Sequence, residues 1–351
     1  MREVDFSMKR TSYLGMTLFL IVILVVPALP GLSQAKQPQA KTQPEYNAYL
    51  ALYNEKDPAK KADMGEKFIN DFKESDFVPN AYKMIIQAYS AQKNWAKVLD
   101  AADRAADFKG ADNSLKGFAY ANAMIAAQNQ NDIDKVLAYG DKVLAIDPND
   151  LNTLITLSAA IPLKYPSNNE QLDKAAGMAT KALAGLQPML NQANAQQKPQ
   201  LVQIDGSLHA TLGLIAYDKK DYTKSIQEYQ SAIKDNMKDD ASHYYLAYDY
   251  MALAAQASKE YTKAIDDEKA AIAAKADQPT MDDLKAKTAG HADDVKKYRD
   301  MAIDELALAV AVNGPVASQA KTALTKQWTD KNDNTNGLDE YIAQKKSQIG
   351  G

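Results

Sequence analysis

DYTKSIQEYQSAI, residues 221–233, is a helical stretch that nearly repeats itself downstream. Its start, Tyr222-Thr-Lys-Ser-Ile226, returns as Tyr261-Thr-Lys-Ala-Ile265, 39 residues later. Two histidines just upstream, His209 and His243, are 34 residues apart. Self-similarity at a period of about 20–50 residues is the signature of stacked repeat units. The stretch therefore predicts an array of repeated helical units rather than one compact core.

The composition of the 351-residue chain supports an all-α array. Alanine is abundant, Lys, Glu, Gln and Leu are common, and no alternating β-branched run predicts a strand. The chain has no cysteine, which excludes disulfides, thiolate metal sites and a lipid-modified cysteine. The net charge of −4 gives no electrostatic reason to expect nucleic acid as a partner.

Helical periodicity recurs as one helix, a short polar turn and a second helix. The pattern predicts about six such hairpins within residues 45–278, with a Gln/Asn-rich polar linker near 187–200. The predicted helix pairs lie at 45–79 for the first hairpin, then at 82–91 with 95–108, 118–128 with 133–146, 151–163 with 172–186, 201–217 with 222–234, and 241–257 with 261–274. Five extra residues near 254–259 account for the two unequal periods. Residues 279–351 are predicted to form a helical cap over the end of the array.

The residues at fixed places in these hairpins resemble the tetratricopeptide repeat family. Leu212-Gly213 matches the Leu-Gly of its first helix, Asp221-Tyr222 the turn and aromatic, Ala232 a small position of its second helix, and Pro148 its terminal proline. Equivalent aromatic or apolar positions are Trp95, Ile133, Leu172 and Tyr261. The resemblance covers roughly residues 80–275 and suggests an exported bacterial protein of this type. It implies an α-solenoid of antiparallel hairpins whose first helices line a concave groove.

The N-terminus predicts export. Lys9 and Arg10 precede an apolar run, Tyr13–Val26, which is followed by helix-breaking residues and a small-residue cleavage site after Ala35. Residues 1–35 are thus a predicted signal peptide, residues 36–44 a disordered leader, and the mature chain is periplasmic or secreted. The alternative is an uncleaved inner-membrane anchor over Tyr13–Leu32 that leaves the rest facing the periplasm, and this segment would be the chain's sole contact with the membrane.

Motifs for catalysis are missing from the sequence. There is no Gly-x-Ser-x-Gly elbow and no phosphate-binding glycine loop, so we expect no enzyme and no cofactor. Residues 330–337 resemble a calcium loop, but Ala343 stands where a bidentate Glu is required, which favours a polar turn before a helix near Leu338. His209 and His243 lack a third ligand for zinc, so we expect them to be structural and predict no metal site.

The family resemblance places a partner-binding surface on two successive first helices. The positions that correspond to the concave groove are Ala210, Leu214 and Tyr217, followed by Tyr244, Tyr248 and Met251. Each set is spaced i, i+4, i+7 and forms one helical stripe. The predicted function is a non-catalytic envelope scaffold that binds a protein or peptide there. Two alternatives remain: the C-terminal cap covers this surface, or the Tyr/His-rich region 209–251 serves a ligand, a metal or an enzyme activity.

Overall fold

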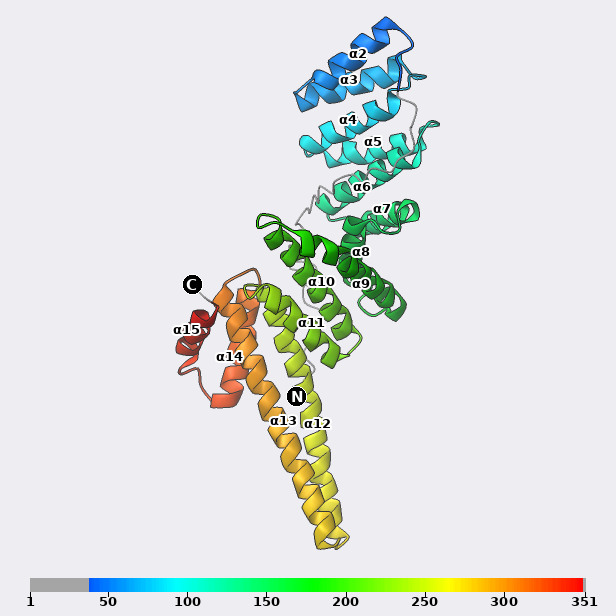
Figure 1. Ribbon diagram of the computed structural model, residues 1–351. Helices are drawn as coiled ribbons and strands as arrows, with labels where there is room; N and C mark the ends of the chain where they lie inside the picture. Colours follow the sequence, from blue (N-terminus) through cyan, green and yellow to red (C-terminus); the bar gives the residue numbers. More distant parts are fainter. Residues whose placement is uncertain (1–37, 350–351) are drawn as a thin grey trace. The chain divides into compact units, whose positions relative to one another are not determined.

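The computed structural model describes residues 38–349, and every regular element in that range is an α-helix (Figure 1). This confirms the all-α prediction for the described part of the chain. The predicted signal peptide, its cleavage site and the alternative anchor lie outside the described residues. Within residues 38–349, no helix combines the length and the apolar character that crossing a membrane requires. The chain divides into two compact units, whose boundary falls between Lys164 and Tyr165.

The first unit consists of seven helices that pack one on the next within residues 38–164. They are α2 (Gln43–Asn54), α3 (Pro58–Asp71), α4 (Val78–Ala91), α5 (Trp95–Asp107), α6 (Asn113–Asn129), α7 (Ile133–Ile146) and α8 (Leu151–Lys164). Besides these sequential contacts, α4 touches α6 and α2 touches α4. Each helix therefore packs mainly on its neighbours in the chain, and α4 also meets the helices two places before and after it, as in stacked helical hairpins.

The second unit begins with α9 (Asn169–Gln192), α10 (Lys198–Asp218) and α11 (Tyr222–Asp235). The predicted polar linker at 187–200 is much shorter in the structure, because α9 continues through Pro188 to Gln192 and α10 starts at Lys198. Buried Leu186 anchors the last turns of α9, and the Gln, Met, Leu and Asn that follow are compatible with a helix. The many Gln and Asn residues in this stretch suggested a linker, but the backbone is helical up to Gln192 and again from Lys198.

Three of the turns inside the hairpins share one local design. A residue with left-handed backbone is followed at once by an Asn or Asp whose side chain caps the next helix; the pairs are Lys93-Asn94, Asn131-Asp132 and Lys220-Asp221. Asp221, for example, accepts a hydrogen bond from the backbone N–H of Lys224 over 3.1 Å. The left-handed residue reverses the chain, and the cap satisfies an N–H group that has no partner within the helix.

The small residues of the repeat pattern allow close helix contacts. Ala101 and Ala105 on α5 and Ala232 on α11 are fully buried. At Gly213 of α10, an added Cβ would lie 3.0 Å from the ring of Tyr229, so glycine here lets the tyrosine pack against the helix backbone. The Leu-Gly of the repeat pattern is thus explained by a specific aromatic neighbour.

The start of the helical region differs from the sequence prediction. The disordered leader was expected to reach residue 44, but α2 already begins at Gln43. Thr42 and Glu45 form a capping box, in which each side chain bonds the backbone N–H of the other residue. Pro44 lies in the first turn, where its missing N–H costs nothing. Local capping therefore starts the helix earlier than hydrophobic periodicity alone suggests.

The predicted sixth hairpin does not exist, because α12 (Asp240–Ala273) runs without a break where a turn was expected. The segment contains neither a left-handed residue nor an Asn or Asp cap, since Lys259-Glu260 stands where the preceding hairpin has Lys220-Asp221. Ala, Gln, Ser, Lys and Glu all propagate a helix. The chain reverses only at Lys275, which has a φ of 53°, before Asp277 caps α13.

Helix α13 (Gln278–Val312) runs beside α12 and forms the most extensive helix pair of this unit (Figure 1). Partly or fully buried positions recur along both helices at alternating three- and four-residue steps, which is the spacing of a coiled-coil seam. They include Ala254, Ala257, Tyr261, Ala264, Glu268 and Ala271 on α12, and Met281, Leu284, Thr288, His291, Val295 and Tyr298 on α13. We call residues 257–298 the arm, and residues 240–253 with 302–312 the root. The predicted cap boundary at residue 279 thus falls within the first turn of α13.

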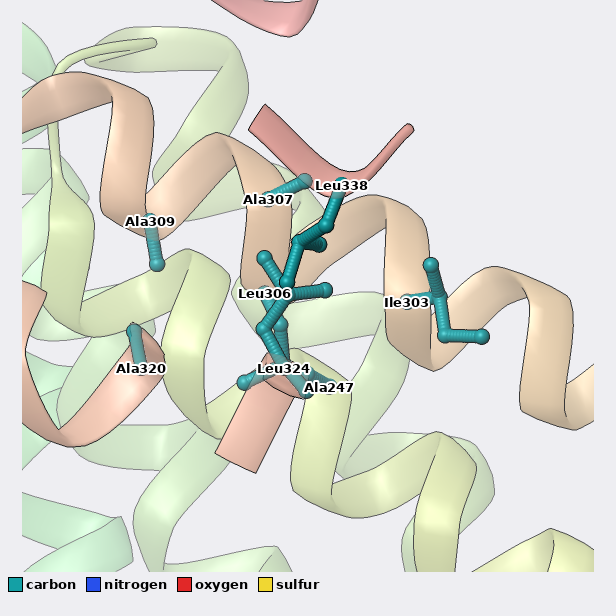
Figure 2. Close-up of a cluster of buried hydrophobic side chains, with 8 residues drawn as sticks. All are labelled: Ala247, Ile303, Leu306, Ala307, Ala309, Ala320, Leu324 and Leu338. Carbon is teal, nitrogen blue, oxygen red and sulfur yellow. The ribbon is translucent and has the colours of Figure 1, made fainter. Parts of the chain in front are cut away.

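The last two helices, α14 (Ala317–Asn332) and α15 (Leu338–Gln348), pack on α13. Their shared core contains Ala247 of α12, Ile303, Leu306, Ala307 and Ala309 of α13, Ala320 and Leu324 of α14, and Leu338 of α15 (Figure 2). The carboxylate of Asp240 accepts a hydrogen bond from the backbone N–H of Val316 over 2.8 Å, which joins the start of α12 to the start of α14. Residues 333–337 form the turn expected before Leu338, with Gly337 in a left-handed conformation.

Candidate functional site

The six residues predicted to bind a partner lie on two helices of the second unit that touch each other. Ala210, Leu214 and Tyr217 belong to α10, and Tyr244, Tyr248 and Met251 belong to α12; we call this set the tyrosine face. Leu214 is buried with 4% exposure, and the other five side chains are half-buried. Five of the six residues therefore keep part of their surface accessible on the described chain.

Each tyrosine of this face packs against another aromatic ring. The Tyr244 hydroxyl donates a hydrogen bond to the Tyr248 hydroxyl over 2.9 Å, and the two ring centroids are 4.7 Å apart. Tyr217 on α10 contacts the ring of Tyr222 with a centroid separation of 5.7 Å. Burial and the hydrogen bond to Tyr248 raise the pKa of Tyr244 well above its ordinary value. Its hydroxyl consequently stays protonated at neutral pH and offers a neutral polar group at the edge of an apolar surface.

The C-terminal helices cover one side of the tyrosine face. Tyr244 and Met251 pack against the core shared by α12, α13, α14 and α15. Met251 and Ala210 also pack against a second cluster, made of Tyr229, Leu246, Tyr250 and Ala302. Part of the predicted binding stripe thus serves as support for the cap, and Tyr217 and Tyr248 are the tyrosines of the set outside both clusters.

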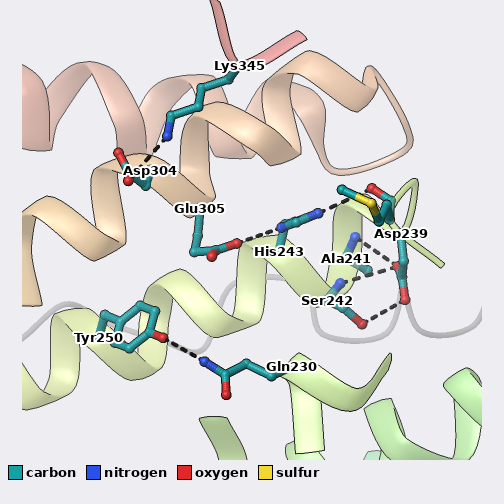
Figure 3. Close-up of polar contacts among 10 residues, drawn as sticks. Gln230, Asp239, Ala241, Ser242, His243, Tyr250, Asp304, Glu305 and Lys345 are labelled. Atoms are coloured by element: carbon teal, nitrogen blue, oxygen red, sulfur yellow. Dashed lines mark hydrogen bonds and ion pairs between the residues drawn. The ribbon is translucent and has the colours of Figure 1, made fainter. Parts of the chain in front are cut away.

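His209 and His243 each contact a different carboxylate. His243 is buried, and its Nδ1 lies 2.6 Å from a carboxylate oxygen of Glu305 on α13, while its Nε2 lies 3.3 Å from the carbonyl oxygen of Met237 (Figure 3). His209 Nδ1 lies 2.7 Å from a carboxylate oxygen of Glu228 on α11. The contact with Glu228 raises the pKa of His209. Both rings therefore tie helices together through carboxylates.

Possible metal ligands do not converge in the described chain. Within residues 38–349, no group of three or more His, Asp or Glu side chains is arranged to hold a metal ion. His291, the third histidine, lies in the arm and pairs with Glu260 at 3.4 Å. The two-histidine arrangement considered from the sequence also does not form, because His209 and His243 face different carboxylates.

Sequence reasoning missed a buried acid in α12, the residue that follows Tyr248 in the chain. Asp249 of α12 is fully buried, and one of its carboxylate oxygens accepts a hydrogen bond from the Ser225 hydroxyl over 2.7 Å. Its other oxygen has no hydrogen-bond partner within the described residues. Desolvation raises the pKa of Asp249 to about 7. The signal was present in the sequence as one carboxylate within the apolar stretch YYLAYDYMAL, residues 244–253.

The first unit carries a further half-buried stripe along α6. Phe118, Asn122, Ile125 and Asn129 are spaced i, i+4, i+7 and i+11 and are all partly exposed. The two asparagine amides donate to the carbonyl oxygens of Phe118 and Ile125 over 2.8 and 2.9 Å. Lys83 of α4 lies over the Phe118 ring, 5.8 Å from its centroid. This surface combines apolar, amide and cationic groups, so it is less apolar than the tyrosine face.

No protein-family model and no curated protein sequence matches this chain. Among solved structures, it is similar to a tetratricopeptide repeat protein from Parabacteroides merdae ATCC 43184, with 11% identity and a TM-score of 0.42 over 82% of this chain and 100% of the other. The Cut9-Hcn1 hetero-tetramer of APC/C is 17% identical, with a TM-score of 0.25 over 77% of this chain and 52% of the other. The human IFIT1 dimer with PPP-AAAA is 15% identical, with a TM-score of 0.24 over 84% of this chain and 79% of the other. The described chain consists of α-helices that pack mainly on their neighbours in the chain, which is the all-α arrangement that the resemblance to tetratricopeptide repeats predicts.

Proposed function

We propose that this protein is a non-catalytic interaction module of the cell envelope that binds a peptide segment of another protein at the tyrosine face. The observation that carries the proposal is that the Tyr244–Tyr248 ring pair on α12 and Tyr217 on α10, a helix that touches α12, are all partly exposed on a helical support. Aromatic side chains held in one geometry are typical anchors of protein interfaces, because they bury a large area with little loss of side-chain entropy.

The packing beneath the cluster supports the same role. Leu214 is buried under the face, and Met251 is held between the two clusters that join α12 to α13. A partner would therefore meet side chains that are already ordered, and the entropic cost of binding is correspondingly smaller. The neutral hydroxyls favour a partner with apolar residues and backbone hydrogen-bonding groups over a highly charged one.

The compartment in this proposal rests on the predicted signal peptide, which places the partner in the periplasm or outside the cell. An uncleaved N-terminal anchor would keep the same module at the inner membrane. Mass spectrometry of the native N-terminus distinguishes the two, because a chain that starts at residue 36 supports secretion. A chain that starts at Met1 and sediments with membranes would support the anchored alternative.

A photo-crosslinking amino acid at position 248 tests the binding site itself. We expect the crosslinker to capture a defined partner from the cell envelope, and capture to fall several-fold when Tyr217→Ala is added. The same crosslinker at Tyr261 of the arm is the matched control, because Tyr261 is also half-buried but lies away from the proposed surface. Capture that is equal at both positions, or unaffected by Tyr217→Ala, would remove the tyrosine face as the binding site.

The competing alternative is a ligand- or metal-binding role, or an enzyme activity, for residues 209–251. Metal analysis of the purified protein and of the His209→Ala, His243→Ala double variant tests its metal form. Stoichiometric metal that disappears in the double variant would favour this alternative. A scaffold would lose helix contacts at Glu228 and Glu305 in that variant, but no bound ion.

A further inference from the structure

The turn before α15 contains an asparagine that is followed by a glycine, Asn336-Gly337. Both residues are exposed, and the backbone N–H of Leu338 donates to the carbonyl oxygen of Thr335 over 3.2 Å, which closes the turn around them. Gly337 has a φ of 78°, a conformation that glycine adopts without strain. Because glycine has no Cβ, the backbone nitrogen of Gly337 is open to approach by the side chain of Asn336.

The three asparagines of residues 332–336 differ in how their side-chain amides are held. Asn332 donates to the carbonyl oxygen of Trp328 over 3.0 Å, and Asn334 donates to the carbonyl oxygen of Asn332 over 2.9 Å. Asn334 also accepts a hydrogen bond from the backbone N–H of Asn336 over 2.8 Å. Within the described residues, Asn336 itself forms hydrogen bonds only through its backbone. Its side-chain amide can therefore turn toward the backbone nitrogen of Gly337.

The peptide group between Asn336 and Gly337 is polarised by its surroundings. Its carbonyl oxygen accepts a hydrogen bond from the indole N–H of Trp328 over 3.2 Å, and its N–H donates to no acceptor within residues 38–349. Gly337 also lies at the start of α15, where the helix dipole favours negative charge. The indole and the dipole together stabilise the anion that forms when hydroxide removes the N–H proton, as donors directed at a developing oxyanion do.

We infer that Asn336 is a site of spontaneous deamidation. The deprotonated nitrogen of Gly337 attacks Cγ of Asn336 and forms a new C–N bond, while the side-chain nitrogen takes up a proton and leaves as ammonia. Water then adds to either carbonyl carbon of the resulting succinimide and breaks the bond from that carbon to the ring nitrogen, which regains a proton. Opening at Cγ gives aspartate, and opening at the backbone carbonyl carbon gives isoaspartate. In total the reaction consumes water and releases ammonia, and no oxidant or reductant takes part.

The chain contains another Asn-Gly pair, Asn313-Gly314, in a different environment. Asn313 ends α13 in a left-handed conformation, and its N–H donates to the carbonyl oxygen of Val310 over 3.1 Å. A Cβ added to Gly314 would lie 2.4 Å from the side-chain carboxyl group of Asp240, so this glycine is pressed against an acid. A nearby carboxylate opposes the removal of a proton from the Gly314 nitrogen. We therefore expect Asn313 to react more slowly than Asn336 in the folded protein.

The products would change the surroundings of α15. Both add one negative charge, which takes the net charge from −4 to −5. Isoaspartate also inserts a methylene into the backbone, so the carbonyl group that Trp328 contacts is displaced. Trp328 packs against Tyr341 of α15 with a centroid separation of 5.0 Å, and Leu338 at the start of that helix is buried in the core of Figure 2. We expect isoaspartate to loosen α15. This modification needs no partner at the tyrosine face, so its test is independent of the proposed function.

Ageing of protein produced from the full 351-residue sequence, at mildly alkaline pH, tests the site. We expect the peptide that contains residue 336 to gain about 1 Da and to separate into aspartate and isoaspartate forms. The peptide with Asn313 should react at least about five-fold more slowly, whereas both should react at similar rates in a urea-unfolded chain. Trp328→Phe, which keeps an aromatic ring but removes the N–H donor, should slow the reaction at Asn336 roughly two- to ten-fold.

Three results would overturn the proposal: no mass change at Asn336 in folded protein over the time in which the unfolded chain reacts, equal rates at Asn313 and Asn336 in the folded chain, or a rate at Asn336 that Trp328→Phe leaves unchanged. Amide hydrogen exchange then tests the consequence for α15. The separated isoaspartate form should exchange faster in α15 than unmodified protein, whereas Asn336→Asp, which adds the charge without the methylene, should not. Equal exchange in all three forms would contradict the loosening of α15.

Discussion

Two six-residue segments of nearly the same sequence adopt different backbones in this protein. Lys219-Lys-Asp-Tyr-Thr-Lys224 is a turn followed by a new helix, whereas Ser258-Lys-Glu-Tyr-Thr-Lys263 lies inside the continuous α12. The decisive difference is Asp221 against Glu260, because the shorter carboxylate reaches the N–H groups of its own first turn. Glutamate is a good helix former and a poor cap, so the second segment propagates the helix.

This local difference separates two kinds of packing. The turn at Asp221 returns the chain onto α10 and keeps the hairpin compact, whereas the missing turn at Glu260 lets α12 and α13 extend together as the arm. Helices α11, α14 and α15 bury side chains of the root, whereas the buried residues of the arm are two alanines, Ala257 and Ala264, with 4% and 8% exposure. We therefore expect the root and the arm to respond differently to equivalent substitutions.

The largest expected effect is in the root. Leu246 is 1% exposed within a core cluster, so Leu246→Ala should lower the free energy of local unfolding by about 2–5 kcal/mol. Leu284→Ala in the arm should lower it by less than about 1 kcal/mol, since Leu284 is only half-buried. Amide hydrogen exchange resolved on peptides from each region measures both values. Equal losses would mean that the arm is as well packed as the root.

A second large effect concerns Asp249, the buried acid of the root. Its pKa of about 7 in the folded protein lies above the ordinary carboxyl value of 3.8, so folding takes up a proton between these values. The corresponding stability is fully present below about pH 4 and is lost as the pH rises toward 7, by an amount on the order of a few kcal/mol. Asp249→Asn should remove this slope from the pH dependence of the denaturation midpoint.

Among the residues that the structure describes, no basic group contributes to the pKa shift of Asp249 and could reverse this sign. Ser225 and Tyr229 face it from α11, and the tyrosines Tyr222 and Tyr250 are also close enough to interact with its charge. His209→Gln is the matched control. The pKa of His209 is also raised, so its contribution to stability is also lost as the pH rises, but in a higher range that begins near its ordinary value of 6.5. A slope between pH 4 and 7 that survives Asp249→Asn but not His209→Gln would contradict the assignment to Asp249.

Sequence reasoning predicted the hairpins but not the arm, for a physical reason. Periodicity reports which residues face a core, and the seam of a coiled coil produces nearly the same pattern as a packed repeat. The echo Tyr261-Thr-Lys-Ala-Ile265 therefore suggested a sixth hairpin, although the cap needed for a turn was missing. Capping chemistry at single positions decided the topology there.

The candidate site was predictable to a similar degree. The spacing of Tyr244 and Tyr248 on one face was evident from the sequence, but the packing of α13–α15 against Tyr244 and Met251 depends on contacts about 50–90 residues away along the chain. The His243–Glu305 contact likewise spans 62 residues, and the contact of buried Asp249 with Ser225 spans 24. Sequence alone had left open whether the cap covers the tyrosine face, and the structure places it over one side.

A smaller effect tests the role of Asp221 as the residue that caps the start of α11. Asp221→Ala should lower the stability of the α10–α11 hairpin by about 1 kcal/mol, because the N–H of Lys224 loses its acceptor. Glu260→Ala should change the stability of the arm by at most about 0.5 kcal/mol, since the His291 contact that it removes is exposed to solvent. Hydrogen exchange at the start of α11 and at the middle of α12 provides the comparison. A loss at Glu260 as large as that at Asp221 would show that both acids act as caps.

The smallest expected effect is that of glycine substitutions at Lys220 and Lys259, which should change stability in opposite directions. Lys220 has a φ of 63°, a left-handed conformation that glycine adopts without strain, so Lys220→Gly should stabilise the hairpin by about 0.5 kcal/mol. Lys259 is helical, and Lys259→Gly should destabilise the arm by about 0.5–1 kcal/mol, because glycine is a poor helix former. Thermal unfolding combined with segment-resolved hydrogen exchange detects both changes. Effects of the same sign would show that the backbone at Lys220 is not left-handed or that the backbone at Lys259 is not helical. In that case the difference between Asp221 and Glu260 would not explain why one segment forms a turn and the other a helix.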